Sequence, residues 1–390
     1  MPHSLIPQRL SLNIFATFLV IGAYVPFLPV WLEGRGISKE EIGLIFAIAL
    51  WAKIPVGLLV ASIADQTGDR KITLIVISLV TLLGFCTFSL LQGFWQLLIA
   101  WAIVGTLLTT LIPLADSLAV IAIKRIQMDY GRVRLWGSVA FILVSIGGGF
   151  YLEGKPDDAV LHIILLGSAL MVISACWVPN LREAPRKKQR LALFELLATP
   201  SFVVFVLTAA VLQASHAALY GFATLSWIEA GIHKTIIGLL WAEGVVAEIA
   251  LLACSGYLLR RLGSTGLFLL AGVAGILRWT VLGTTSSLPA LFAVQALHAL
   301  TFAGTLIASI SYISQHVARD QAATAQGLYD GLAMGLLFGV AMAVAGWAYA
   351  DIGPGVFYVM VGFSALGCCG ALVLRAMQNT AKKQSASPPS

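Results

Sequence analysis

The sequence predicts an all-α membrane protein with twelve transmembrane helices, arranged as two six-helix bundles related by a pseudo-twofold axis along the membrane normal. Of the 390 residues, 59% are hydrophobic and only 11% are charged, whereas soluble domains carry about 25% charged residues. A spanning helix needs about 20 apolar residues, so the chain has room for about twelve spans joined by short loops. The second half also repeats a residue pattern of the first half, which indicates two fused copies of one membrane unit.

The expected spans follow one another with short interruptions by glycine, proline or charged residues. In chain order they are 11–32, 41–62, 72–92, 95–122, 134–152, 159–179, 198–222, 236–259, 265–284, 288–313, 323–349 and 354–375. The first six form a bundle at 1–180 and the last six a bundle at 198–376. Between them, the charged run REAPRKKQR is typical of a solvated linker, which we place at 181–197. The polar, Pro- and Ser-rich tail at 377–390 is expected to be disordered.

The internal repeat extends beyond composition. Tyr24, Trp31 and Glu33 recur 196 residues later as Tyr220, Trp227 and Glu229, and Gly36, Lys39 and Gly43 recur 195 residues later as Gly231, Lys234 and Gly238. The same alignment places Lys53 opposite Glu248. Two opposite charges therefore occupy matching positions in two otherwise apolar helices, and we expect them to face a common cavity.

The loops alternate in charge along the chain. Most of the 24 Lys and Arg residues fall in every second loop and at the two ends of the chain. The positive-inside rule then places both termini in the cytoplasm of a multi-pass protein, which we expect in a bacterial inner membrane. The net charge of +6 is explained by this topology, so no nucleic-acid partner is expected. The five cysteines lie in apolar stretches without metal-ligand spacing, and they are interpreted as packing residues.

The loop after the second span contains a recognisable motif, Ala61-Ser-Ile-Ala-Asp65-Gln-Thr-Gly68-Asp-Arg70-Lys71. It resembles the signature of the major facilitator superfamily, with Ala61 in place of the first glycine. Gly68 suits a tight turn, and Asp65 is able to pair with a cation or a helix N-terminus at a cytoplasmic gate. We assign Asp65, Gly68 and Arg70 to this gate. Asp116, Arg134 and Asp330, at similar depth, are interpreted as a charge cluster of the same gate.

Longer segments give a narrower resemblance. These are 129–138 (DYGRVRLWGS), 212–222 (LQASHAALYGF), 244–248 (GVVAE), 278–279 (RW) and 297–298 (LH). Together they resemble the 3-phenylpropionic acid transporter group, which is related to the lactose and nucleoside proton symporters. The resemblance covers most of the chain. It implies proton-coupled uptake of a small organic solute, with an aromatic carboxylate as the leading substrate class.

Ionisable side chains inside a span cost about 2.5–3.5 kcal/mol or more at mid-helix, so they are expected to be paired and functional. We select Lys53, Glu248, Arg278, His298 and His216 as candidates for substrate binding or proton coupling, and add the ring residues Tyr24 and Tyr220. The alternatives are a purely structural ion pair for Lys53, Glu248 or Arg278, and a neutral hydrogen-bonding role for each imidazole. The aromatic rings are alternatively packing residues.

The leading function is therefore a symporter that moves a small solute with protons and works as a monomer. Proton-antiport efflux and nucleoside or sugar symport are the alternatives within transport. A membrane receptor or assembly factor is the alternative outside it, but such a protein has no need of charges at mid-membrane. The sequence has no nucleophile elbow, phosphate loop or metal-ligand cluster, so we predict neither an enzyme nor a cofactor.

Overall fold

The computed structural model describes residues 5–126, 128–181 and 193–386, and the regular elements in these ranges are all helical. By their contacts the residues form two compact units. Unit 1 comprises Met1–Lys188 with Tyr220–Val245, and unit 2 comprises Gln189–Leu219 with Val246–Ser390. The predicted division into bundles at 1–180 and 198–376 stays a prediction.

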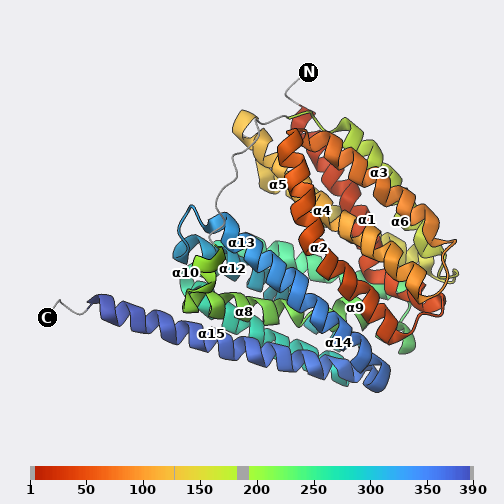
Figure 1. The fold of residues 1–390 in the computed structure, drawn as a ribbon. Helices are drawn as coiled ribbons and strands as arrows, with labels where there is room; N and C mark the ends of the chain where they lie inside the picture. Colours follow the sequence, from red (N-terminus) through yellow and green to blue (C-terminus); the bar gives the residue numbers. More distant parts are fainter. Residues whose placement is uncertain (1–4, 127, 182–192, 387–390) are drawn as a thin grey trace. The chain divides into compact units, whose positions relative to one another are not determined.

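Unit 1 is built mainly from the first six long helices. They are α1 (Ile6–Gly34), α2 (Lys39–Thr67), α3 (Arg70–Phe88), α4 (Phe94–Ile126), α5 (Tyr130–Leu152) and α6 (Ala159–Trp177), joined by most of α9 (Ala217–Glu229) and the start of α10 (Lys234–Thr284). α1 packs against α5 and α6, α2 packs against α4, and α3 packs against α4 and α6 (Figure 1). Caps fix the entry of two of these helices. Ser38 and Glu41 form a capping box at α2, and Asp69 accepts from the Ile72 amide at α3.

Unit 2 contains the remaining elements. They are α7 (Leu193–Leu197), α8 (Pro200–Ala214), the rest of α10, α11 (Leu288–Gln295), α12 (Gly304–His316), α13 (Ala322–Gly331), α14 (Leu337–Ile352) and α15 (Val356–Ala386), with π-helical turns at Ala299–Ala303 and Leu332–Leu336 and a 3₁₀ turn at Gly353–Gly355. α8 lies alongside α15 and α14 (Figure 1). Its inner face packs into a core that includes Phe205, Phe268, Tyr312 and Tyr329.

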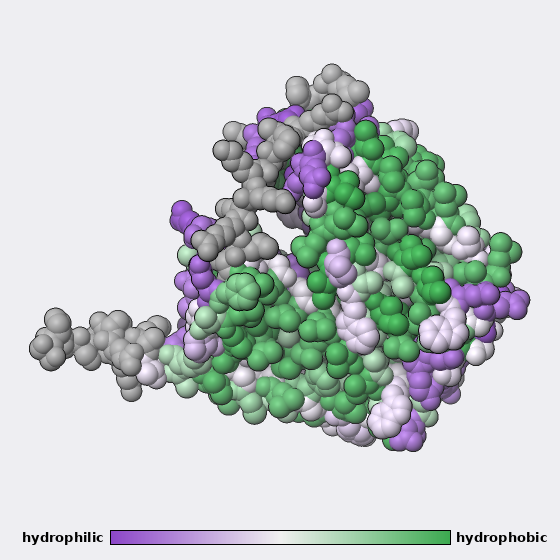
Figure 2. All heavy atoms as spheres, in the orientation of Figure 1, coloured by the Kyte–Doolittle hydropathy of each residue, from purple (hydrophilic) through white to green (hydrophobic). Residues whose placement is uncertain are grey.

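Within the described residues, ten helical stretches are long and apolar enough to cross a membrane. Two of them, Lys234–Thr284 and Ala322–Thr380, have 51 and 59 residues, more than twice the roughly 20 that one crossing needs. The first is interrupted at Gly263, whose φ of 65° and ψ of 178° are not helical. Figure 2 shows apolar side chains over most of the visible face of each unit, with hydrophilic ones toward the helix ends. The twelve-span count and the pseudo-twofold axis stay predictions.

The C-terminal helix differs from the sequence-based expectation. The tail at 377–390 is expected to be disordered, whereas α15 continues to Ala386. Residues 376–386 contain Ala, Gln and Lys, which favour helix, and the first proline comes only at Pro388. Of the predicted linker, residues 182–192 lie outside the described part of the chain and 193–197 form α7.

The repeat noted in the sequence is also present in the backbone. Gly36 and Gly231 have φ values of 79° and 80°. Such positive φ values are readily adopted only by glycine. This turn in each half therefore depends on an equivalent glycine.

Within unit 1, α5 and the start of α10 approach each other at backbone distance. A Cβ on Gly238 would lie 2.2 Å from the Ser145 carbonyl oxygen, and a Cβ on Gly149 would lie 2.4 Å from the Lys234 carbonyl oxygen. Small residues permit this approach, Ser145 and Gly149 on α5 and Gly238 on α10, as is common between membrane helices. These contacts hold residues 234–238 against the N-terminal helices of the unit.

We expect Gly238→Ala to destabilise the protein, because the obstacle is backbone and not a flexible side chain. Overpacking of this kind costs about 1–3 kcal/mol. Gly57→Ala is the matched control, since a Cβ there meets nothing within 4 Å. Thermal unfolding of both purified variants in detergent measures the difference. Equal melting temperatures for wild type and Gly238→Ala would show that α5 and α10 can move apart without loss of stability, which would contradict a required close contact.

Candidate functional site

Two helix interruptions in unit 2 each place a histidine at the break. α8 ends at Ala214 and α9 begins at Ala217, with Ser215 and His216 in a turn between them. α11 ends at Gln295, and His298 directly precedes the π-helical turn Ala299–Ala303. Broken helices and π turns within membrane helices occur preferentially at functional sites, since non-helical backbone there needs protein partners. The two breaks define the candidate site.

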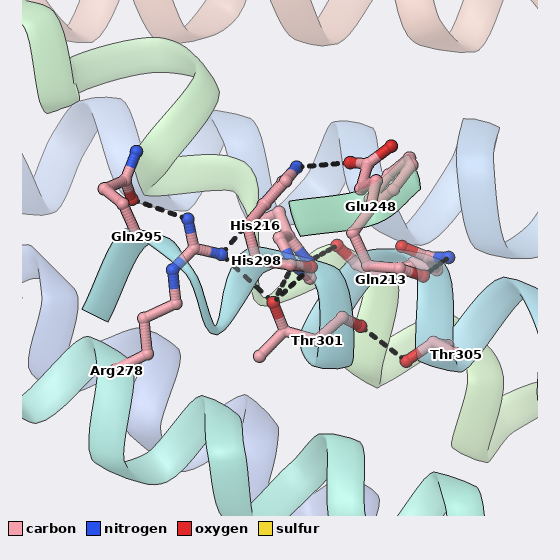
Figure 3. A network of polar contacts seen from close by, with 9 residues as sticks. Gln213, His216, Glu248, Arg278, Gln295, His298, Thr301 and Thr305 are labelled. Atoms are coloured by element: carbon pink, nitrogen blue, oxygen red, sulfur yellow. Dashed lines mark hydrogen bonds and ion pairs between the residues drawn. The ribbon is translucent and has the colours of Figure 1, made fainter. Parts of the chain in front are cut away.

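Arg278 of α10 lies between these breaks and is completely buried. Its Nη2 donates to Gln295 Oε1 at 2.7 Å. Its Nη1 donates to His298 Nδ1 at 2.9 Å and to Thr301 Oγ1 at 3.0 Å (Figure 3). Both Nη nitrogens thus donate to acceptors from the neighbouring broken helix, which offsets part of the cost of burying a permanent charge.

Glu248 completes the network from the other side of His298. Its Oε1 lies 2.8 Å from His298 Nε2 (Figure 3). The Glu248 side chain is 21% exposed, whereas that of His298 is 8% exposed. His298 therefore links a buried cation to a partly exposed carboxylate.

The Arg278 guanidinium determines which atoms of His298 and Glu248 carry a hydrogen. A guanidinium only donates, so His298 Nδ1 must accept and carries no hydrogen. A neutral imidazole then has its hydrogen on Nε2, which donates to Glu248 Oε1. Glu248 must accept at Oε1, so a proton that arrives at Glu248 binds at Oε2. A doubly protonated His298 would point an N–H at the Arg278 guanidinium, and the geometry disfavours that state.

His216 extends the network on the side of α8. Its Nδ1 lies 3.1 Å from the Gln213 carbonyl oxygen, which only accepts, so Nδ1 carries the hydrogen. Its Nε2 lies 3.0 Å from Thr301 Oγ1, and the Thr301 hydroxyl then donates to it. Thr301 Oγ1 accepts from Arg278 at the same time. His216 is fully buried, and its ring meets Trp279 edge-on at 5.2 Å. It supports Thr301 from a position without solvent access.

The other candidates for solute contact lie in unit 1. Lys53 lines a cavity of about 300 Å³ beside α4, together with Asp65 and Arg70. The predicted pairing of Lys53 with Glu248 joins residues of different units and stays a prediction. Tyr24 packs edge-on against Trp101 at 5.2 Å, and its repeat partner Tyr220 lies 5.7 Å from the ring of Trp241. Both tyrosine rings thus have aromatic packing partners.

Five of the six predicted gate residues lie in unit 1. Asp65 accepts from Arg70 at 2.7 Å, and Gly68 ends α2 in the left-handed conformation. The Tyr130 hydroxyl donates to Asp116 at 2.7 Å. Arg134, which acts electrostatically on Asp116, lies over the ring of Phe18 at 4.4 Å.

Asp330 belongs to unit 2 and accepts from Gln326 at 3.3 Å. Its grouping with Asp116 and Arg134 therefore joins residues of different units and stays a prediction.

Sequence reasoning missed the neutral members of the network. They are Gln213, Gln295, Thr301 and Thr305. Gln213 and Gln295 could have been found from the sequence, since a side-chain amide within an apolar span needs a hydrogen-bond partner. Thr301 had none, because threonine satisfies itself within many helices; here its hydroxyl bridges Arg278 and His216. Among the described residues, no group of three or more His, Cys, Asp or Glu is arranged to hold a metal ion.

A second charged group, also missed, lies within unit 1 where α1 ends and α2 begins. We call it the Lys39–Lys234 cluster: Glu33, Lys39, Asp157, Glu229 and Lys234. Lys39 pairs with Glu33 and, at 2.8 Å, with Glu229, while Lys234 pairs with Asp157 at 2.9 Å. Lys39 and Lys234 are repeat partners, as are Glu33 and Glu229. The cluster ties residues 229–234 to the N-terminal helices.

Comparison with known proteins decides the family. Residues 8–360 match the sequence profile of the MFS_1 like family. The chain belongs to this family. It is a multi-pass membrane transporter of the major facilitator superfamily, in agreement with the resemblance found in its motifs.

Relatives of this MFS_1 like chain include named transporters. A probable 3-phenylpropionic acid transporter of Escherichia coli (strain K12) is 33% identical over 373 residues, which covers 94% of this chain and 96% of the relative. A lactose permease of Klebsiella oxytoca is 26% identical over 376 residues, 88% of each chain.

Solved structures support the fold. The nucleoside transporter NupG superposes with a TM-score of 0.81 at 16% identity, over 95% of this chain and 98% of that one. A bacterial homologue of the lysosomal transporter Spinster gives a TM-score of 0.73 at 15% identity over the full length of both chains. At such identities the similarity concerns the fold alone.

The protonation pattern of His298 predicts how its variants differ. His298→Gln offers an amide oxygen to Arg278 and an amide N–H to Glu248, so it should retain much of the transport rate. His298→Leu leaves Arg278 without this acceptor, at a cost of about 1–3 kcal/mol or more, and we expect transport to fall about tenfold or further.

Initial uptake rates in proteoliposomes, normalised to inserted protein, compare the two variants. If His298→Gln were as inactive as His298→Leu, the hydrogen-bond pattern inferred for His298 would not explain its role in transport.

Glu153, outside the spans, predicts a pH effect at the end of unit 1 that carries the Lys39–Lys234 cluster. The bond from His233 at 2.9 Å, supported by the Thr235 amide, holds the pKa of the Glu153 carboxyl below its usual value. Because the pKa is lowered in the folded protein, the ionised carboxylate stabilises the folded state at any pH above the ordinary glutamate pKa of about 4.3. This stabilisation is lost as the pH falls through the lowered pKa. The carboxylate is 39% exposed, so the effect is small.

Melting temperatures of wild type and Glu153→Gln should thus differ near neutral pH and converge toward about pH 3. Asp351→Asn controls for the loss of an exposed acid. A difference that grew on acidification would contradict the bond with His233.

Proposed function

We propose that this transporter is a proton-coupled symporter that imports a small organic solute, with an aromatic carboxylate as the leading substrate class. The observation that carries the proposal is the chain Arg278–His298–Glu248, in which a buried permanent cation is linked through a neutral imidazole to a partly exposed carboxylate. Ionisable groups within apolar spans are costly and are retained at ion and proton pathways.

The balance of charge between Arg278 and Glu248 explains how the network would couple a proton to a solute. With Glu248 ionised, its negative charge compensates Arg278 within the network. When a proton binds at Glu248 Oε2, this compensation is lost and the site becomes net positive. A solute carboxylate restores the balance, so protonation and anion binding favour each other. Such reciprocal coupling requires only that each ligand binds more tightly when the other is present.

Exposure assigns different roles to the members of the network. Glu248, at 21% exposure, is the proton-binding group. Arg278 is fully buried, and its Nη1 and Nη2 atoms already donate hydrogen bonds to protein acceptors. It therefore acts through His298 and not by direct contact with the solute. Solute contacts are assigned to Lys53, Tyr24 and Tyr220. His216 holds Thr301, and through Thr301 it positions Arg278.

Two six-helix bundles that alternate around a central solute site complete the mechanism. Asp65, Gly68 and Arg70 form the cytoplasmic gate with Asp116, Arg134 and Asp330. Both termini lie in the cytoplasm and the protein resides in the bacterial inner membrane as a monomer. The alternating charge of the loops supports this orientation.

The substrate class is proposed from the 33% identical relative, a probable 3-phenylpropionic acid transporter. Other relatives favour two other solutes, because a lactose permease aligns over 88% of this chain and a putative nucleoside transporter is 26% identical over 325 residues. Nucleoside or sugar symport is thus the second candidate. Efflux by proton antiport is the third, since the Asp65 motif also suits that direction of transport.

The decisive experiment is uptake into proteoliposomes with an imposed inward proton gradient. Radiolabelled phenylpropionate, a nucleoside and a disaccharide are tested in parallel, each with and without a protonophore. Symport predicts accumulation above equilibrium that the protonophore abolishes. Accumulation only under an outward-directed proton gradient would instead establish antiport, and binding without accumulation of any solute would overturn the proposal.

Glu248→Gln should separate coupling from binding. A glutamine cannot take up the proton, yet it preserves the side-chain volume and an acceptor for His298. Gradient-driven accumulation should therefore disappear, while exchange of labelled for unlabelled solute across the membrane continues. Asp320→Asn, an exposed acid in the loop after α12, is the control. If Glu248→Gln still concentrated solute, the coupled proton would bind elsewhere.

A further inference from the structure

A groove at the end of unit 1 where α1 begins lies outside the proposed transport site. It has a volume of about 740 Å³ and is formed where four segments converge: the start of α1, the start of α3, the end of α4 and the residues after α6. We call it the Arg9 groove. Its lining side chains belong to residues 5–12, 71, 125 and 176–181.

The Arg9 groove has a strongly positive lining. Arg9, Lys71 and Arg125 line it, one from each of three helices, and no aspartate or glutamate is among the lining residues.

The same groove has an apolar rim. Leu5, Leu12 and Trp177 line it and remain 44%, 40% and 60% exposed. Tryptophan is enriched at the level of lipid headgroups, and cationic pockets between membrane helices bind anionic headgroups. The groove thus combines positive charge for an anionic headgroup with an apolar surface for the acyl chain of the same molecule.

We propose that the Arg9 groove binds the phosphate of an anionic phospholipid. Arg9 and Arg125 present planar guanidinium groups, which suit phosphate oxygens, and Lys71 adds a point charge. A free phosphate ion has the same head chemistry but makes no use of the apolar rim. A bound lipid would join α1, α3, α4 and the end of α6, and would stabilise unit 1 by mass action. This end of the unit is the one proposed to face the cytoplasm.

Native mass spectrometry of the delipidated full chain tests the site. Dioleoyl-phosphatidylglycerol and dioleoyl-phosphatidylcholine are titrated separately, and inorganic phosphate is added as a competitor. We expect the anionic lipid to bind more tightly, to raise the melting temperature and to resist competition by phosphate. Each groove cation should contribute about fivefold to its affinity.

The variant Arg9→Gln/Lys71→Gln/Arg125→Gln should therefore lose at least about tenfold in affinity for phosphatidylglycerol. Lys124→Gln/Arg132→Gln/Arg319→Gln removes the same charge from exposed positions that do not line the groove, and it should bind as wild type. Should the groove variant fail to fold, Arg125→Gln alone should still lose about fivefold.

Equal binding by the groove variant and its control would overturn the proposal, as would equal binding of the two lipids to wild type. Displacement of the lipid by inorganic phosphate would overturn the assignment to a lipid in favour of a free anion.

Discussion

The interior of unit 2 is organised by the need to surround one permanent charge. Arg278 has no exposed surface and its guanidinium does not lose its proton, so acceptors must be brought to it. Gln295, Thr301 and His298 supply them from the broken helix α11–α12. Because His298 accepts at Nδ1, its other nitrogen must donate, and that donor meets Glu248. One buried cation thereby fixes the tautomer of a histidine and the acceptor state of a carboxylate.

The ionisable members of this network were predictable from the sequence, and its amide and hydroxyl members were not. Glu248, Arg278, His298 and His216 stand out because charge or imidazole is rare in an apolar span. Gln295 and Thr301 are ordinary polar residues, and membrane helices contain many of these. Their importance comes from the direction in which Arg278 points, which depends on helix rotation. Hydropathy contains no information about that rotation.

The backbone breaks escaped prediction for a related reason. The sequence predicts continuous spans at 198–222 and 288–313, and hydropathy averaged over a span does not register a turn of two residues. Neither break contains proline or glycine, the usual signals. At the first break, His216 bonds the Gln213 carbonyl and Thr301. The contact with Thr301 is tertiary, and local propensity does not report tertiary contacts.

The repeat shows which residues the two halves share and which they do not. Turn glycines agree to within a degree of φ between Gly36 and Gly231, because no other residue adopts that conformation readily. The interior charges differ: Lys53 stands opposite Glu248, and the position 195 residues before Arg278 is Leu83, which is 57% exposed. The Arg278 position therefore has no charged counterpart in the first half, although the turn glycines correspond. A buried cation is costly unless it is paired and hydrogen-bonded, so the chain meets this cost at Arg278 and not at Leu83.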